Sequence, residues 1–250
     1  MPAIEKKVSG AAKIAVIIPA YNEEKTIGGV ISGIKQVLPY ADIVVIVDKS
    51  KDQTVKIAQD MGATVIRLPL KMGMGCAVQA GCKYACRKGY DFLIRMDSDG
   101  QHVPAEINKL LLPVLQKGAD LTIGSRYLDQ TDYRSPFVRR GVMVFLAYLV
   151  SWIYGKKFTD TTSGFKAMNR NVIKFLAEHY PSIGGTPTLI VLKWAGFSIK
   201  EVPVFMRQRE TGDSYFTSTR KIAYMSRVLV ELLALLVKRK NTEFTQEVAE

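Results

Sequence analysis

The chain alternates between short apolar runs and longer stretches in which apolar residues recur every three or four positions. The first kind indicates buried strands, and the second indicates helices with one apolar face. Strand-like runs lie at 13–19, 43–48, 64–67, 91–97, 120–124 and 199–205. Helical patterns lie at 24–38, 52–61, 74–88, 104–117, 137–154, 169–178, 186–195 and 217–238. This order predicts an α/β fold with a mostly parallel sheet flanked by helices.

The length of 250 residues suits one domain with a sizeable core. We predict a single domain over residues 1–240 and a disordered polar tail over 241–250, with a frayed start. Within that domain, 13–125 carries most of the strand-like runs, whereas 126–240 is more helical. The two parts are expected to bind different ligands.

Two carboxylates follow the apolar run that ends near residue 94. Asp97 and Asp99 are two positions apart, Gln101 follows at the next odd position, and Gly100 lets the backbone turn. Ligands of open α/β sheets bind beyond the carboxyl ends of the strands, and hard oxygen donors suit Mg²⁺ or Mn²⁺. Because Asp-x-Asp also occurs in ordinary surface turns, the metal assignment depends on the neighbouring motifs.

Two earlier strand ends also carry candidate site residues. Pro19 is expected to end the first strand, since proline cannot donate to a central ladder. Asp48 ends the second strand, and Asp52 suits the N-cap of the next helix. Asp48 is therefore expected beside the same crevice as Asp97, although a turn residue at a helix entry is an alternative reading of it.

The net charge of +12 is concentrated around two apolar stretches, 142–154 and 228–237. Both are shorter than the roughly 20 apolar residues that a membrane-spanning helix needs. Basic residues flank each one: Arg139, Arg140, Lys156 and Lys157, then Arg220, Lys221, Arg227, Lys238, Arg239 and Lys240. Such helices are typical of an anionic membrane interface, while two core helices with solvated ends are the alternative. Nucleic-acid binding is disfavoured, because the basic residues are not interleaved with aromatics.

The three cysteines, Cys76, Cys82 and Cys86, fall in one helical segment without a nearby histidine. We expect reduced thiols packed in a helix rather than a metal site. Their odd number and the lack of a recognisable leader favour a cytoplasmic protein.

Six motifs occur along the chain in a fixed order. They are 18–24 (IPAYNEE), 47–54 (VDKSKDQT), 97–102 (DSDGQH), 124–126 (GSR), 160–166 (DTTSGFK) and 209–214 (RETGDS). Together they resemble the inverting family-two glycosyltransferases of GT-A fold. Within that family the chain resembles the dolichol-phosphate mannose synthases and their bacterial and archaeal relatives, which move a sugar onto a polyprenyl phosphate. The resemblance spans about residues 13–235.

The resemblance implies a role for each matching residue. The metal, Mg²⁺ or Mn²⁺, would be held by Asp97, Asp99 and Gln101. The nucleotide-sugar would contact Pro19, Tyr21, Glu23, Asp48, Asp97, Ser98, Arg126 and Arg209. Catalysis is expected from Asp99, Arg126 and Arg209, and the acceptor phosphate is expected to meet Arg139 or Arg140. A phosphate acceptor is already ionised, so the reaction needs no strong general base.

The implied function is metal-dependent inverting transfer of a hexose from GDP-mannose or UDP-glucose to a polyprenyl phosphate. The protein would be cytoplasmic and peripheral on the membrane, which leaves open a membrane-anchoring subunit or a homo-oligomer. Residues 13–125 would bind the nucleotide-sugar, and 126–240 the acceptor and membrane.

Several positions depart from the family pattern. Val47, Lys49 and Met74 stand where the family usually has an acid, a glycine and a lysine, and 185–188 (GTPT) replaces a usual acidic pair. Two alternatives therefore stay open: a family-two enzyme with a soluble acceptor, and a non-catalytic glycosyltransferase-like subunit. The intact metal and arginine positions favour an enzyme.

Overall fold

A computed structural model of the chain describes residues 12–128, 137–181, 185–208, 227, 228, 230, 231 and 234; for 137–140, 142 and 143 only the backbone is described. Its described part contains a seven-stranded sheet in the order β3-β2-β1-β4-β6-β5-β7. The strands are β1 (Ile14–Ala20), β2 (Asp42–Val47), β3 (Thr64–Arg67), β4 (Phe92–Arg95), β5 (Leu121–Ser125), β6 (Lys166–Asn169) and β7 (Ile199–Pro203).

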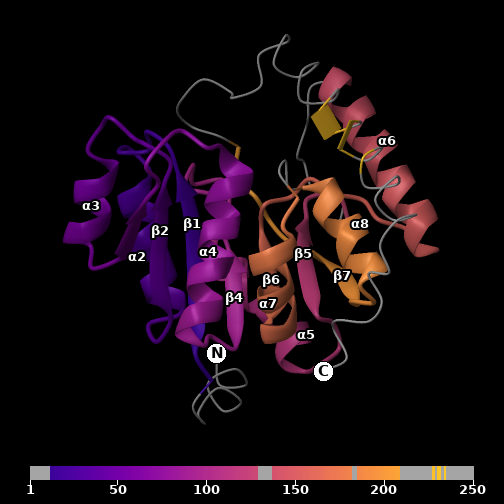
Figure 1. The fold of residues 1–250 in the computed structure, drawn as a ribbon, viewed down its shortest axis with the longest axis horizontal. Helices are drawn as coiled ribbons and strands as arrows, with labels where there is room; N and C mark the ends of the chain where they lie inside the picture. The colour runs from indigo at the N-terminus through magenta and orange to yellow at the C-terminus, as the bar shows by residue number, and fades with distance from the viewer. Residues whose placement is uncertain are drawn as a thin grey trace.

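Helices cover both faces of this sheet (Figure 1). One face packs against α2 (Ile27–Val37), α3 (Thr54–Asp60) and α5 (Ile107–Leu115), which follows the 3-10 turn η1 (Pro104–Glu106). The other packs against α4 (Met74–Lys88), α7 (Arg170–His179) and α8 (Thr186–Trp194), with α6 (Phe137–Tyr154) beside α8. Every residue of β1 is buried, which explains its unbroken apolar run.

The predicted mostly parallel α/β sheet is confirmed, with one strand that the sequence did not reveal. Strands β1, β2, β3 and β4 pair in parallel, as do β5 and β7. Strand β6 lies between β4 and β5 and is antiparallel to both. It has only four residues, begins with Lys166 and leads directly into α7, so it offers no apolar run to detect.

The prediction that Pro19 ends the first strand is wrong by one residue. Strand β1 continues to Ala20, whose carbonyl accepts the N–H of Asp48 at 2.9 Å. Alternate residues of a strand face opposite neighbours, so Pro19 faces the β4 side. Pairing with β4 ends at Ile17, whose carbonyl accepts the N–H of Met96, and the missing proline donor therefore breaks no ladder bond.

The carboxyl ends of β1, β2 and β4 meet at one edge of the sheet, because these strands are adjacent and parallel. They lead into the segments that contain Tyr21, Asp48 and Asp97. Since β6 is antiparallel to β4, its first residue, Lys166, reaches the same edge. Four of the recognised motifs thus converge beside the point where ligands of open α/β sheets bind.

Candidate active site

The two motifs that follow β1 and β2 are joined by hydrogen bonds. The N–H of Asn22 donates to Ser50 Oγ at 2.9 Å, and Asn22 Oδ1 accepts from the N–H of Lys51 at 2.9 Å. The N–H of Glu23 donates to Thr54 Oγ1 at 2.8 Å. These bonds fix the loop that holds Tyr21.

Tyr21 follows the carboxyl end of β1 and presents an accessible ring. About a third of the residue is exposed, and Lys71 Nζ lies 3.7 Å from the ring centroid, a cation–π contact. Glu23 Oε2 accepts a hydrogen bond from Thr26 Oγ1 at 2.9 Å. Contacts of Tyr21, Glu23 and Pro19 with a nucleoside stay predictions.

Asp48 is buried and holds the start of α4. Its Oδ1 accepts the N–H of Met72 at 2.7 Å, and its Oδ2 accepts the N–H of Gly73 at 2.8 Å. A carboxylate oxygen has further lone pairs, so these bonds leave acceptor capacity for a base. Recognition of the base by Asp48 stays a prediction, but its hydrogen bonds give it a structural role as well.

Asp97 lies just past β4 between two basic groups. Its Oδ1 lies 3.2 Å from Arg95 Nη2, and its Oδ2 lies 3.8 Å from His102 Nε2. The N–H of Asp97 donates to His102 Nδ1 at 2.9 Å, and the imidazole stacks on Phe165 with centroids 4.8 Å apart. Burial opposes ionisation of Asp97, but the charge and hydrogen bond of Arg95 lead the effects that outweigh it and hold its pKa below the ordinary value.

The predicted metal ligands share the turn after β4. Asp97, Asp99 and Gln101 are all partly exposed, and Asp99 Oδ1 accepts the N–H of Gln101 at 3.1 Å. Among the described residues, no three histidine, cysteine or acidic side chains cluster as a metal site. The turn instead offers two carboxylates and one amide oxygen, a set that fits Mg²⁺ or Mn²⁺, which leave positions for substrate phosphates.

Gly164 packs its backbone against the carboxylate of Asp97. A Cβ atom at this position would lie 2.4 Å from Asp97 Oδ2 and 2.6 Å from Oδ1. Any side chain would therefore displace the carboxylate. This close approach explains why a glycine is needed at this position of the 160–166 motif.

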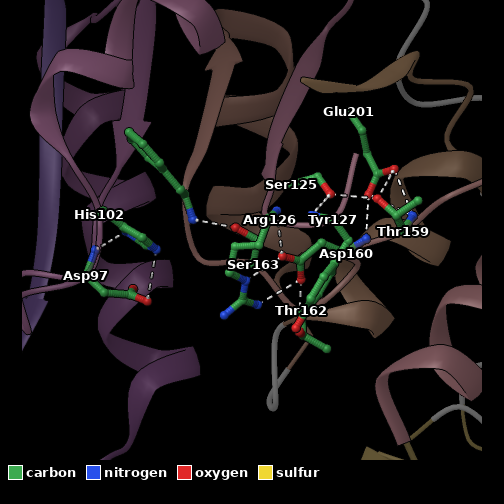
Figure 2. A network of polar contacts seen from close by, with 11 residues as sticks. Asp97, His102, Ser125, Arg126, Tyr127, Thr159, Asp160, Thr162, Ser163 and Glu201 are labelled. Atoms are coloured by element: carbon green, nitrogen blue, oxygen red, sulfur yellow. Dashed lines mark hydrogen bonds and ion pairs between the residues drawn. The ribbon is translucent and has the colours of Figure 1, made fainter. Parts of the chain in front are cut away.

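Arg126 and Asp160 form a buried ion pair near the turn that contains Asp97 and Asp99. Arg126 Nε donates to Asp160 Oδ2 at 2.6 Å, and Nη2 donates to Oδ1 at 2.9 Å. Figure 2 shows the guanidinium extending from Asp160 towards the side of Asp97 and His102. Asp160 thus already holds Nε and Nη2 of Arg126, so the predicted contact with a diphosphate would be made by a guanidinium that is fixed along one side.

Glu201, which the sequence did not single out, holds the Asp160 turn in place (Figure 2). Its carboxylate accepts the N–H groups of Thr159 and Asp160 at 2.8 and 2.7 Å. Burial raises the pKa of this carboxyl. No sequence signal links Glu201 to Asp160, because β7 and this turn are far apart along the chain.

Three of the arginines predicted for the site have no described side chain. Arg209 lies outside the described residues, as does most of the helical pattern at 217–238. Arg139 and Arg140 lie in α6, but only their backbone is described.

An open groove of about 740 Å³ runs along α6 beside the buried ion pair. Its walls include Tyr127, Val144, Tyr148, Trp152, Lys156 and Thr159. Trp152 and Tyr148 are 75% and 72% exposed. Among the described helices, none is both long enough and apolar enough to cross a bilayer.

Comparison with known proteins identifies the family. The model of the family described as glycosyl transferase family 2 matches residues 15–176. The chain is 34% identical over 210 residues to polyprenol monophosphomannose synthase of Mycolicibacterium smegmatis, covering 80% of this chain and 79% of that protein. It is 30% identical over 212 residues to undecaprenyl-phosphate mannosyltransferase of Micrococcus luteus, covering 81% and 86%.

Solved structures share the fold. Glucosyl-3-phosphoglycerate synthase from Mycobacterium tuberculosis, in complex with Mn²⁺, UDP and glucosyl-3-phosphoglycerate, matches 92% of this chain and 82% of its own with a TM-score of 0.69 at 23% identity. Its complex with Mg²⁺ and UDP matches 93% and 82% with a TM-score of 0.71 at 23% identity. The chain therefore belongs to glycosyl transferase family 2 and is a glycosyltransferase of GT-A fold.

Proposed function

We propose that the protein transfers a hexose, with inversion and with a divalent cation, from GDP-mannose or UDP-glucose to a polyprenyl phosphate at a membrane surface. The observation that carries this proposal is the apolar groove along α6, which opens beside Thr159 and hence beside the Arg126–Asp160 pair. A prenyl chain needs such an apolar path next to charged groups that face its phosphate. The names of the related mannosyltransferases support the same class of acceptor.

On the donor side, the crevice supplies positioning and charge. Tyr21 offers a ring face for the base, and Asp48 retains acceptor capacity next to the start of α4. A divalent cation at Asp97, Asp99 and Gln101 would neutralise charge on the leaving diphosphate. Arg126, anchored by Asp160, would bring a fixed positive charge to the same diphosphate without having to be ordered first.

On the acceptor side, the ionised phosphate itself is the nucleophile, so the protein contributes alignment rather than a strong base. The aromatic residues exposed on α6, Tyr148 and Trp152, would lie in the membrane interface. Arg139 and Arg140, which precede them in the sequence, would attract anionic lipid and meet the acceptor phosphate.

A negative charge introduced into the groove by substitution tests the proposed acceptor. We expect Trp152→Glu to lower transfer to polyprenyl phosphate in liposomes by about tenfold or more, since an aromatic side chain that becomes buried against the prenyl chain contributes about 1.5–3 kcal/mol. Nucleotide binding in solution should not change. Tyr40→Glu, on an exposed aromatic between α2 and β2, is the matched control and should behave as the wild type. Equal activity of the Trp152 variant with the lipid acceptor would refute the groove as its path.

A further inference from the structure

A buried cluster of positive charge lies on the sheet face that α4, α7 and α8 cover. Lys166, the first residue of β6, pairs in register with Arg95, the last residue of β4. Paired residues of antiparallel strands point to the same face, and Leu93 and Met168, two residues along each strand, pack in the core under these helices. Only 3% of Lys166 and 7% of Arg95 are exposed.

Both cations keep donors without partners. Arg95 Nη2 contacts Asp97, but Arg95 Nε is buried and has no hydrogen-bond partner. Across residues 12–128, 137–181 and 185–208, no group forms a hydrogen bond or an ion pair with the Lys166 ammonium. Burial, followed by the charge of Arg95, lowers the pKa of Lys166 to about 7, although Asp97 and Asp160 act in the opposite direction.

The amino end of α8 adds further donors. Thr188, in its first turn, is 2% exposed; its Oγ1 lies near the Tyr180 hydroxyl, but no hydrogen bond of ordinary length joins it to another described group. The helix starts at Gly185 without a side-chain cap and has no acid in its first turn. Tyr180 interacts electrostatically with Arg95 and lies next to Thr188, so the start of α8 lies near the Arg95 end of the sheet. A helix amino terminus favours an anion.

The nearby carboxylates are already matched with other cations. Asp160 is bound by both arms of Arg126, and Asp97 lies against Arg95. Within the described part of the chain, the Lys166 ammonium therefore has no carboxylate in direct contact, and Asp97 and Asp160 attract it only at longer range. An unpaired ammonium in a buried site is costly, and an anion would relieve that cost.

We propose that Arg95, Lys166 and Thr188 form a buried anion site that takes a phosphate group. A guanidinium, an ammonium and a helix amino terminus are the donors that phosphate oxygens use most often in proteins. If the proposed function holds, the phosphate is that of the acceptor, which Arg139 and Arg140 would meet first at the membrane surface before it reaches this site next to Asp97. A free phosphate ion would use the same donors.

Thermal unfolding with inorganic phosphate, at constant ionic strength and without divalent cations, tests the site. We expect phosphate to raise the Tm of the wild type in proportion to the logarithm of its concentration. Lys166→Met should have a higher Tm than the wild type without phosphate and bind phosphate about tenfold more weakly or worse. Lys200→Met, on an exposed lysine of β7, is the matched control and should keep the wild-type response.

A second pair of variants separates charge from shape. Thr188→Glu places a carboxylate where the phosphate would bind, so it should remove the phosphate response and unfold at a higher Tm than Thr188→Gln, which has the same size without the charge. A Thr188→Glu protein less stable than Thr188→Gln would overturn the proposal. So would a phosphate response that Lys166→Met leaves unchanged, or a wild type that phosphate does not stabilise.

A short, water-soluble prenyl phosphate monoester then identifies the source of the phosphate. If the prenyl phosphate competes with inorganic phosphate in the wild type but not in Lys166→Met, the site belongs to the acceptor. If the prenyl phosphate does not compete in the wild type, the site belongs to a resident phosphate ion. Because no sugar donor is present, the result is independent of transfer. A protein that binds phosphate here but transfers no hexose would refute the proposed function and leave the anion site standing.

Discussion

Replacing Gly164 by alanine should displace Asp97, a proposed metal ligand, while adding only one methyl group. The new Cβ atom would lie 2.4 to 2.8 Å from the carboxylate atoms of Asp97, whereas ordinary contacts are 3.4 Å or longer. The carboxylate would have to move by about 1 Å, which breaks its 3.2 Å contact with Arg95. Overpacking of this kind costs about 1–3 kcal/mol.

We therefore expect Gly164→Ala to lower the free energy of unfolding by about 1–3 kcal/mol in urea. Mn²⁺-dependent binding of a nucleoside diphosphate, measured by calorimetry, should weaken by about tenfold or more, since ligand placement within 1 Å matters in such sites. Gly29→Ala is the matched control, because nothing lies within 4 Å of its Cβ position in α2. Wild-type Mn²⁺ dependence and stability in Gly164→Ala would refute the role given to this contact.

Two further predictions concern buried charge. Asp160→Asn should lower the free energy of unfolding by about 3–5 kcal/mol in urea, because Arg126 would be left as a buried charge without its carboxylate; a loss below about 1 kcal/mol would contradict that reading. The contribution of Lys166 should stabilise the wild type as pH rises from about 7 towards about 8.5, because burial and then Arg95 depress the Lys166 pKa to about 7, so that the unfolded chain binds more protons in that window. The window ends below the ordinary pKa of Cys82, because burial raises the pKa of that thiol and its titration would act in the opposite direction. Urea melts should show that this gain is smaller in Lys166→Met, and an equal gain in both proteins would contradict it.

The sequence anticipated those parts of the fold that depend on local pattern. Helices α4 and α6 have the bounds that the apolar spacing predicted, and β1, β2 and β4 follow from apolar runs that end in polar turns. Such runs are visible because a strand buried on both faces has no room for polar residues. The position of Asp97 just past the carboxyl end of β4 followed from the same rule.

The remaining features depend on contacts between distant segments. Arg126 was expected to meet phosphate, and nothing in the chain near it indicated that Asp160 holds both its arms. The antiparallel insertion of β6 places Lys166 next to Arg95, a neighbour that sequence spacing cannot supply. Glu201 was overlooked for the same reason, since its partners are backbone N–H groups of another segment.

Transfer itself tests the central claim most directly. Liposomes with anionic lipid and polyprenyl phosphate would be incubated with the protein, Mn²⁺ and radiolabelled GDP-mannose or UDP-glucose. We predict that label from one donor enters the lipid fraction, and that Asp99→Asn folds normally but loses this activity together with its Mn²⁺-dependent nucleotide binding. No labelled lipid from either donor, or full activity in the Asp99 variant, would contradict the account.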